Sequence, residues 1–288
     1  MKTSIRPFSM LRNSTLIALL SAGAAQADVT LTSGNSVATV NFGGGALDTL
    51  GMNSWTINGQ NQLHQQWFWF GLDGLAQNPL NTMPSFGINA QTADFVSGTY
   101  TDPVNQFSIM IDYTLAGGQT GGNDWTSDIT ENIKIKNNNS DPNNHLHIRF
   151  YQYSDFNLGG ISSGDTVTIS QIGVSFSKAT QTQGASRVSE TIDNPLAMRA
   201  EAGLTTDSPN TRDHLTSGSA YDLNNVLARG PGDATWALQW NFDITGGQTQ
   251  DVVKDKRLDI EPIPEPSLIA VASLGLFAFV CRSRRSAA

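Results

Sequence analysis

The sequence is poor in cysteine, in charged side chains and in long apolar runs, and each shortage excludes a class of protein. Its single cysteine, Cys281, lies close to the C-terminus, so the residues before it cannot supply a disulfide pair, a cysteine metal site or a catalytic thiol. Charged residues make up only 15% of the chain, against about 25% in an average soluble protein. The longest uncharged apolar run, Leu268 to Cys281, is shorter than the roughly 20 residues of an ordinary transmembrane helix.

Basic residues are scarce between the two ends of the chain. Of the 17 Lys and Arg residues, 11 lie between the terminal basic clusters with all 25 Asp and Glu, so this stretch carries a net charge of 11 − 25 = −14. The terminal basic residues are Lys2, Arg6, Arg12, Arg282, Arg284 and Arg285. An acidic surface repels a phosphate backbone, which excludes nucleic acid as a partner. Abundant small polar residues, with apolar and aromatic residues throughout, indicate a soluble, β-rich extracellular domain.

Residues 1–27 are typical of a secretory signal peptide. A positively charged start is followed by the apolar stretch Leu16 to Ala25, and Ala25-Gln26-Ala27 forms an A-x-A cleavage site with cutting expected before Asp28. An uncleaved membrane anchor is the alternative, but about ten apolar residues are too few to span a bilayer. We therefore predict export and cleavage.

The tail, residues 262–288, has three physical parts in a fixed order. The prolines of Pro264-Glu265-Pro266 impose extended geometry, the apolar segment 267–281 follows, and the last arginines favour the cytoplasmic side of a membrane. At a helical rise the run Leu268 to Cys281 covers only about 21 Å of a roughly 30 Å hydrocarbon core, so a buried core helix is the alternative. Its position at the extreme C-terminus, between prolines and arginines, favours a transmembrane segment with the body outside.

This tail resembles the PEP-CTERM sorting signal. The resemblance implies that an exosortase, a membrane protease or transpeptidase with a cysteine nucleophile, recognises the tail near Pro264 to Pro266 and removes it. It also implies a protein that passes through the inner membrane to the cell surface or biofilm matrix of a bacterium that makes extracellular polysaccharide. The expected partners are therefore the exosortase, the secretion machinery and the membrane, with extracellular polysaccharide as a further candidate.

The body, residues 28–261, has the period-two alternation of β-strands, as in Ile129, Ile133 and Ile135 with polar neighbours. Glycine and asparagine clusters separate the strands, and Ser219 to Ala228 is the one short helix we expect. Many strands without intervening helices predict an all-β, antiparallel sandwich. The expected strands are 36–42, 54–58, 66–72, 92–100, 107–115, 128–136, 145–153, 166–176, 187–192, 234–244 and 249–254.

The body also resembles the β-supersandwich of galactose mutarotases. A glycine-rich turn at Phe42 to Gly45 and an Ile-Lys-Ile-Lys-Asn-Asn strand precede the segment Gln152 to Gly160. Those enzymes carry a His-x-Tyr-Phe-Asn-Leu segment after a similar strand. Tyr153 stands at the position of their catalytic histidine and Asp155 at that of their tyrosine, whereas Phe156 to Leu158 match. The resemblance implies a shared fold but does not support epimerase chemistry.

Two local clusters suggest ligands, and each has a structural alternative. Trp67 and Trp69 share one face of a strand, where they could form a platform for sugar rings, but a strand buried on both faces is the interpretation we favour. His145 and His147 could hold a metal with Asp155 or His64 as a further ligand, but a cross-strand polar pair is the interpretation we favour. We expect no metal and no cofactor.

Acidic pairs are present, but the usual catalytic motifs are not. The sequence contains no G-x-S-x-G, no H-E-x-x-H and no phosphate-binding glycine loop. We therefore predict a non-enzymatic surface or matrix protein with a structural or polysaccharide-associated role. Two alternatives remain, a carbohydrate-binding module that uses Trp67, Trp69 and Tyr153, and a carbohydrate-active enzyme with acids around Asp155.

Overall fold

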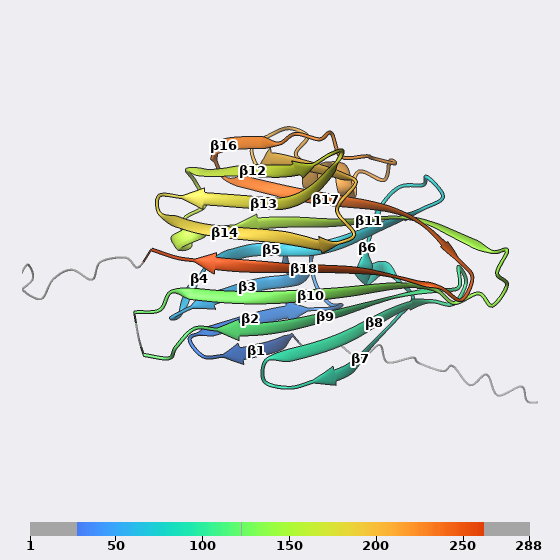
Figure 1. Ribbon diagram of the computed structural model, residues 1–288, viewed down its shortest axis with the longest axis horizontal. Helices are drawn as coiled ribbons and strands as arrows, with labels where there is room; N and C mark the ends of the chain where they lie inside the picture. The colour runs from blue at the N-terminus through green and yellow to red at the C-terminus, as the bar shows by residue number, and fades with distance from the viewer. Residues whose placement is uncertain (1–27, 122, 262–288) are drawn as a thin grey trace, which may run out of the picture.

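The computed structural model describes residues 28–121 and 123–261, which form two antiparallel nine-stranded sheets packed face to face (Figure 1). The predicted antiparallel β-sandwich is confirmed. The predicted signal peptide and sorting tail lie outside the described residues, apart from Asp28 at the expected cleavage site. Within the described ranges, no helix is both long enough and apolar enough to cross a bilayer.

Each sheet combines strands from distant parts of the chain. The first sheet has the order β1 (Val29–Ser33), β2 (Ser36–Asn41), β3 (Gly51–Ile57), β5 (Leu63–Leu72), β11 (His145–Phe156), β17 (Ala234–Thr245) and β15 (Arg199–Leu204), with β4 (Gln60–Asn61) beside β3 and β6 (Asn78–Pro79) beside β5. The second has the order β16 (Ala228–Gly232), β12 (Asp165–Ile172), β13 (Ser175–Gln183), β14 (Ser186–Asn194), β18 (Thr249–Asp259), β10 (Thr126–Asn137), β9 (Phe107–Gly117), β8 (Phe95–Asp102) and β7 (Ser85–Gln91). The short helices are η1 (Leu47–Thr49), η2 (Leu80–Thr82), η3 (Leu158–Gly160) and α1 (Thr211–Thr216).

Strand β5 is buried along almost its whole length because it lies inside the first sheet, between β3 and β11. Trp67 and Trp69 have no exposed surface, and their rings contact Tyr100 and Tyr153 with centroids 6.2 Å apart in each case. The hypothesis of an exposed tryptophan platform for sugars is therefore wrong. The burial follows from the aromatic area itself, since four consecutive aromatic side chains are most stable away from water on both faces.

Four charged side chains lie between the sheets with no exposed surface. Glu190, Lys254, Lys256 and Glu131 come from the adjacent strands β14, β18 and β10. Each lysine pairs with Glu131, and their Nζ atoms lie 3.2 and 3.3 Å from Glu190 Oε1. Burial alone would raise the pKa of Glu190, but Lys256 and Lys254 outweigh it and lower that pKa to about 2. Two acids and two bases thus make a neutral ion cluster in the core.

Trp236 and Gln152 connect this ion cluster to the first sheet. Trp236 Nε1 donates to Glu190 Oε2 at 2.9 Å, and Gln152 Nε2 donates to the same oxygen at 2.7 Å. Gln152 lies on β11, and its bond to Glu190 shows that its side chain faces the second sheet. Side chains alternate along a strand, so Tyr151 and Tyr153 face the opposite side of the first sheet.

Two predicted elements differ from the observed ones. Residues 166–176 do not form one strand. They contain most of β12, a turn and the first residues of β13, because the chain reverses at Gly173, which takes a φ of +63°. The short helix is α1 rather than 219–228. Asn210 begins α1 with a capping box, its side chain accepting from Asp213 N at 2.9 Å. Residues 219–228 instead run along β15, where Ala202 N donates to Val226 O at 2.8 Å.

Candidate functional site

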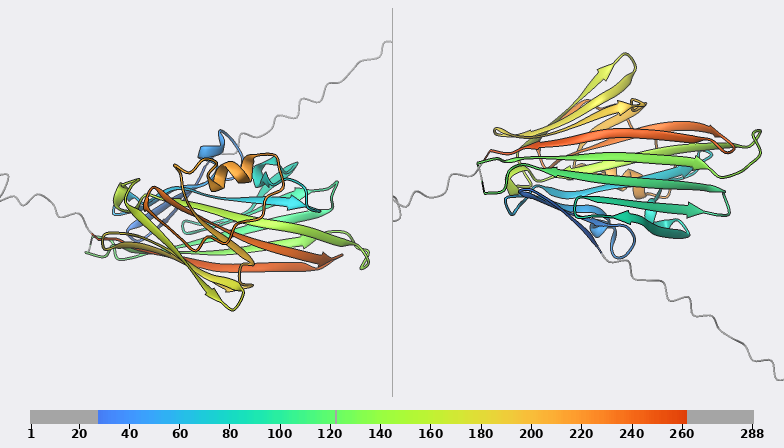
Figure 2. Two further views of the ribbon diagram at one scale, coloured as in Figure 1. Left: turned by 90° about the horizontal axis from the view of Figure 1, so that it is seen from above. Right: turned by 60° about the horizontal axis from the view of Figure 1, so that its bottom comes forward.

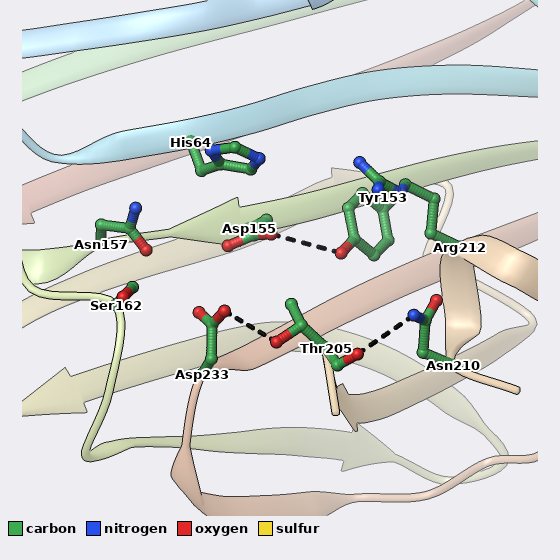
Figure 3. Close-up of a pocket in the computed structure, with 9 residues that line it drawn as sticks. All are labelled: His64, Tyr153, Asp155, Asn157, Ser162, Thr205, Asn210, Arg212 and Asp233. Atoms are coloured by element: carbon green, nitrogen blue, oxygen red, sulfur yellow. Dashed lines mark hydrogen bonds between the residues drawn. The ribbon is translucent and has the colours of Figure 1, made fainter. Parts of the chain in front are cut away.

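A polar pocket of about 440 Å³ opens on the first sheet, at the end where β11 finishes and β17 begins (Figure 3). Helix α1 lies on the same side of this sheet, away from the second sheet (Figure 2). The pocket is lined by His64, Tyr153, Asp155, Asn157, Ser162, Thr205, Asn210, Arg212 and Asp233.

The sheet register brings the two carboxylates of the pocket together. Asp155 pairs with Thr235 across β11 and β17, and Asp233 lies at the bend just before β17, two residues from Thr235. Both side chains therefore line the same pocket. On β11 the pocket face is opposite to the one from which Gln152 contacts the second sheet. Tyr153 shares the pocket face, and its hydroxyl donates to Asp155 Oδ2 at 3.4 Å.

Asp155 has the environment of a group that can hold a proton near neutral pH. Only 3% of it is exposed, and burial raises its pKa to about 6. The charges of His64 and Arg212 act in the opposite direction, whereas the charge of Asp233 acts with burial. An acid of this kind suits proton donation to a substrate.

A third carboxylate, Asp165 on β12, lies close to the pocket without lining it. It has no exposed surface, and burial raises its pKa to about 7, against a hydrogen bond from Gln181 Nε2 at 2.8 Å that lowers it. The charges of Asp233 and Asp155 also raise the pKa of Asp165. This end of the sandwich is therefore rich in carboxylates.

A hydrogen bond holds Asp233, and an ion pair with a second hydrogen bond holds Arg212. Asp233 Oδ2 accepts from Thr205 Oγ1 at 2.7 Å. Arg212 on α1 lies with Nη1 2.6 Å from Asp48 Oδ1 and 3.2 Å from Gln65 Oε1, which anchors its guanidinium group. The pocket thus has fixed polar groups before any ligand enters, which lowers the entropic cost of binding.

Several acceptors at the pocket have no donor. Among the described residues, Asp155 Oδ1, Asn157 Oδ1 and Asp233 Oδ1 are buried and accept no hydrogen bond, and Asp165 Oδ1 is in the same condition. An unsatisfied buried acceptor costs about 1–3 kcal/mol. These atoms are closed to solvent, so a ligand hydroxyl reaches them only where a neighbouring side chain moves. An entering ligand meets the polar side chains that line the pocket, and sugars, with their many hydroxyl groups, suit a lining of this kind.

The sequence-predicted residues divide between this pocket and other places. Tyr153 and Asp155 line the pocket together with His64, whereas Trp67 and Trp69 lie in the core. His145 lies at the opposite end of β11, where its Nδ1 is 2.7 Å from Asp243 Oδ1 on β17, so the cross-strand polar pair is confirmed.

His147 Nδ1 lies 3.6 Å from Asp243 Oδ1, and both histidines are exposed. In the part of the chain that the structure describes, no group of three or more His, Cys, Asp or Glu side chains is placed to hold a metal ion.

Asp233, Arg212 and Asn210 were not found by sequence reasoning. Asp233 reaches the pocket from the bend before β17, Arg212 from α1, and Asn210 from the position that caps α1. Only the capping box of α1 had a local signature in the sequence.

Comparison with known proteins finds no matching family model and no matching curated protein. Among solved structures, a bacterial glucoamylase in complex with acarbose is similar with a TM-score of 0.54 at 9% identity, over 87% of this chain and 36% of the glucoamylase. A proposed aldose 1-epimerase of Escherichia coli K12 has a TM-score of 0.46 at 8% identity, over 82% of this chain and 99% of that protein. This chain spans about a third of the glucoamylase, and such identities show similarity of fold alone.

These comparisons bear on two predictions. No family model matches, so no PEP-CTERM domain is found, and recognition of the tail by an exosortase stays a prediction. The prediction of a non-enzymatic protein is contradicted, because the sandwich has the fold of part of a carbohydrate-active enzyme. That prediction rested on the absence of catalytic sequence motifs. Catalysis by a pair of carboxylates requires no such motif, because the two residues can lie far apart in the sequence and meet only in the fold.

Proposed function

We propose that this protein is a carbohydrate-active enzyme whose site is the pocket of Asp155 and Asp233. The observation that carries the proposal is the convergence of these two carboxylates, one of them an acid with a pKa of about 6, in a concave polar site. Perturbed acids in a pocket are the usual sign of a catalytic centre. The lining, which consists of polar side chains, favours a ligand with many hydroxyl groups.

The reaction class we infer is acid–base chemistry at a sugar acetal, with glycosidic bond cleavage as its main form. Asp155 donates its proton to the glycosidic oxygen as the bond from that oxygen to the anomeric carbon breaks. Asp233 takes a proton from the water that adds to the anomeric carbon. The products are two sugars with free hydroxyl groups, and proton exchange with solvent returns both carboxyl groups to their starting states.

The test is activity of the Asp155→Asn variant against a panel of oligo- and polysaccharides, by release of reducing ends. We expect kcat to fall by about 10²–10⁴-fold, since the amide cannot donate a proton as an acid does. The Asp243→Asn variant, changed at the distant histidine pair, is the matched control and keeps full activity. If the unchanged protein binds sugars but transforms none of the panel, the chain is a carbohydrate-binding protein and the catalytic proposal is wrong.

We also propose that the protein is exported and sorted by an exosortase to the cell surface or matrix. This proposal rests on the sequence of residues 1–27 and of the tail from Pro264 onwards. An alanine triple variant of Pro264, Glu265 and Pro266 should keep its tail, as measured by mass spectrometry of the mature protein. Processing that is unchanged in this variant would refute sorting through this motif.

A further inference from the structure

A second polar pocket, of about 400 Å³, adjoins the first one. Asn210 lines both pockets, and the loop before it contributes Thr205 to the first and Asp207 to the second. The two pockets therefore lie on either side of one short loop. Hydrogen bonds hold this loop, since Asp207 Oδ2 accepts from Leu204 N at 3.0 Å and Asn210 Nδ2 donates to Thr205 O at 3.2 Å.

The lining of the second pocket includes an aromatic ring that a neighbouring ring holds in place. The imidazole of His214 lines this pocket and stacks on the ring of Tyr221, with centroids 4.2 Å apart and planes 9° from parallel. The hydroxyl of Tyr221 is held in turn by Glu201 Oε2 and Asn224 Nδ2, each at 2.6 Å. A ring that is already fixed loses little side-chain entropy when a flat ligand packs on it.

The charged groups of the two pockets indicate what kind of sugar they accept. Arg212 of the first pocket pairs with Asp48, and Arg229 of the second donates to Asp207 Oδ1 at 2.6 Å. Each arginine is therefore already neutralised by a carboxylate. Asp233 in the first pocket and Glu201 in the second accept only from uncharged donors among the described residues. An acidic sugar would meet repulsion there and no unpaired guanidinium group, so uncharged sugars are favoured.

We propose that the second pocket is an additional sugar subsite and that the ligand is an uncharged oligosaccharide lying across the loop of residues 205–210. One sugar unit sits at Asp155 and Asp233, and a later unit of the same chain packs on His214 beside Arg229 and Asp207. This inference rests on the proposed function of the first pocket and adds to it the chain length and charge class of the ligand.

Calorimetric titration with linear glucans, mannans, galactans and xylans of one to six residues tests the inference. We expect the affinity to rise with chain length until one chain reaches both pockets. In the His214→Ala variant the affinity for the longest chains falls about tenfold, while that for one or two residues stays within about twofold. His214→Phe keeps a planar ring and restores the long-chain affinity, and His147→Ala, at an exposed site outside both pockets, changes neither.

Each other outcome has a distinct meaning. Affinity that reaches its maximum at one or two residues, with no effect of His214→Ala, overturns the second subsite and leaves the proposed function intact. Equal weakening for short and long chains in His214→Ala also overturns it, because the histidine would then act through the fold or the first pocket. If no glycan of the panel binds the unchanged protein, the proposed function fails and the subsite fails with it.

Discussion

The ion cluster in the core offers the sharpest test of how this fold is stabilised. Lys254 contacts Glu131, Glu190 and Gln152, and its Nζ lies 5.0 Å from the centre of the Phe68 ring. Replacing Lys254 by Met keeps the volume and apolar stem but leaves two buried glutamates with one lysine. Breaking a buried ion pair in this way costs about 3–5 kcal/mol, a large part of the 5–15 kcal/mol by which a domain is usually stable.

Urea unfolding at neutral pH, followed by tryptophan fluorescence, measures this cost. We expect the midpoint of Lys254→Met to fall by about 1 M or more, given slopes of about 1–3 kcal/mol per M. Lys136→Met is the matched control, because Lys136 lies exposed on β10, and its effect should stay within about 0.5 kcal/mol. Adding Glu190→Gln to Lys254→Met removes the excess charge and recovers part of the loss. A loss below about 1 kcal/mol for Lys254→Met would show that the two buried glutamates do not need both lysines.

Three further predictions concern pH and backbone geometry. The folded-state pKa values of Asp155 and Asp165, about 6 and about 7, exceed their ordinary value, so the native state binds protons that the unfolded state does not. The free energy of unfolding therefore rises as pH falls from about 7 to 4.5. Below about pH 4.5 the free energy of unfolding falls again, because Glu190 has a folded pKa of about 2 and its stabilisation is lost as the unfolded state takes up protons. Urea midpoints that fall steadily from pH 7 to 5 would contradict this profile. For activity, kcat/KM should decrease above about pH 6 as Asp155 loses its proton, and a profile that is flat from pH 5 to 8 would exclude Asp155 as the acid. Finally, Gly51→Ala should destabilise the fold by about 2–4 kcal/mol in urea unfolding, because Gly51 has a φ of +78° and a Cβ would lie 2.2 Å from Gln66 O, whereas Gly59→Ala, also at positive φ but in open space, should cost less.

Local patterns predicted the fold class because alternation is a property of each strand by itself. The alternation of Ile129, Ile133 and Ile135 identified β10, and the observed strand alternates buried and less buried residues as predicted. The hairpin of β12 and β13 was missed because apolar residues continue through Ile172 and Val174, which are exposed at the turn. A single glycine decided that turn, and no periodicity could show it.

The pocket could not be predicted in the same way, because its residues meet only through the sheet register. Asp155 was identified as a candidate from the resemblance of its segment to galactose mutarotases, but its partner Asp233 lies 78 positions further along the chain and comes near it only because β11 pairs with β17. Trp67 and Trp69 drew attention because they are conspicuous in the sequence, yet their neighbours in the sandwich bury them. The alternation of Lys254 and Lys256 with acids likewise gave no sign that both lysines face the core.

Crystallography of the Asp155→Asn variant soaked with its tightest glycan shows whether the pocket of Asp155 and Asp233 binds a sugar. We predict a sugar ring in this pocket, with hydroxyl groups within hydrogen-bond distance of the lining side chains of Asp233 and Asn157. A glycan bound only elsewhere on the sandwich at saturating concentration would mean that this pocket is not the sugar site.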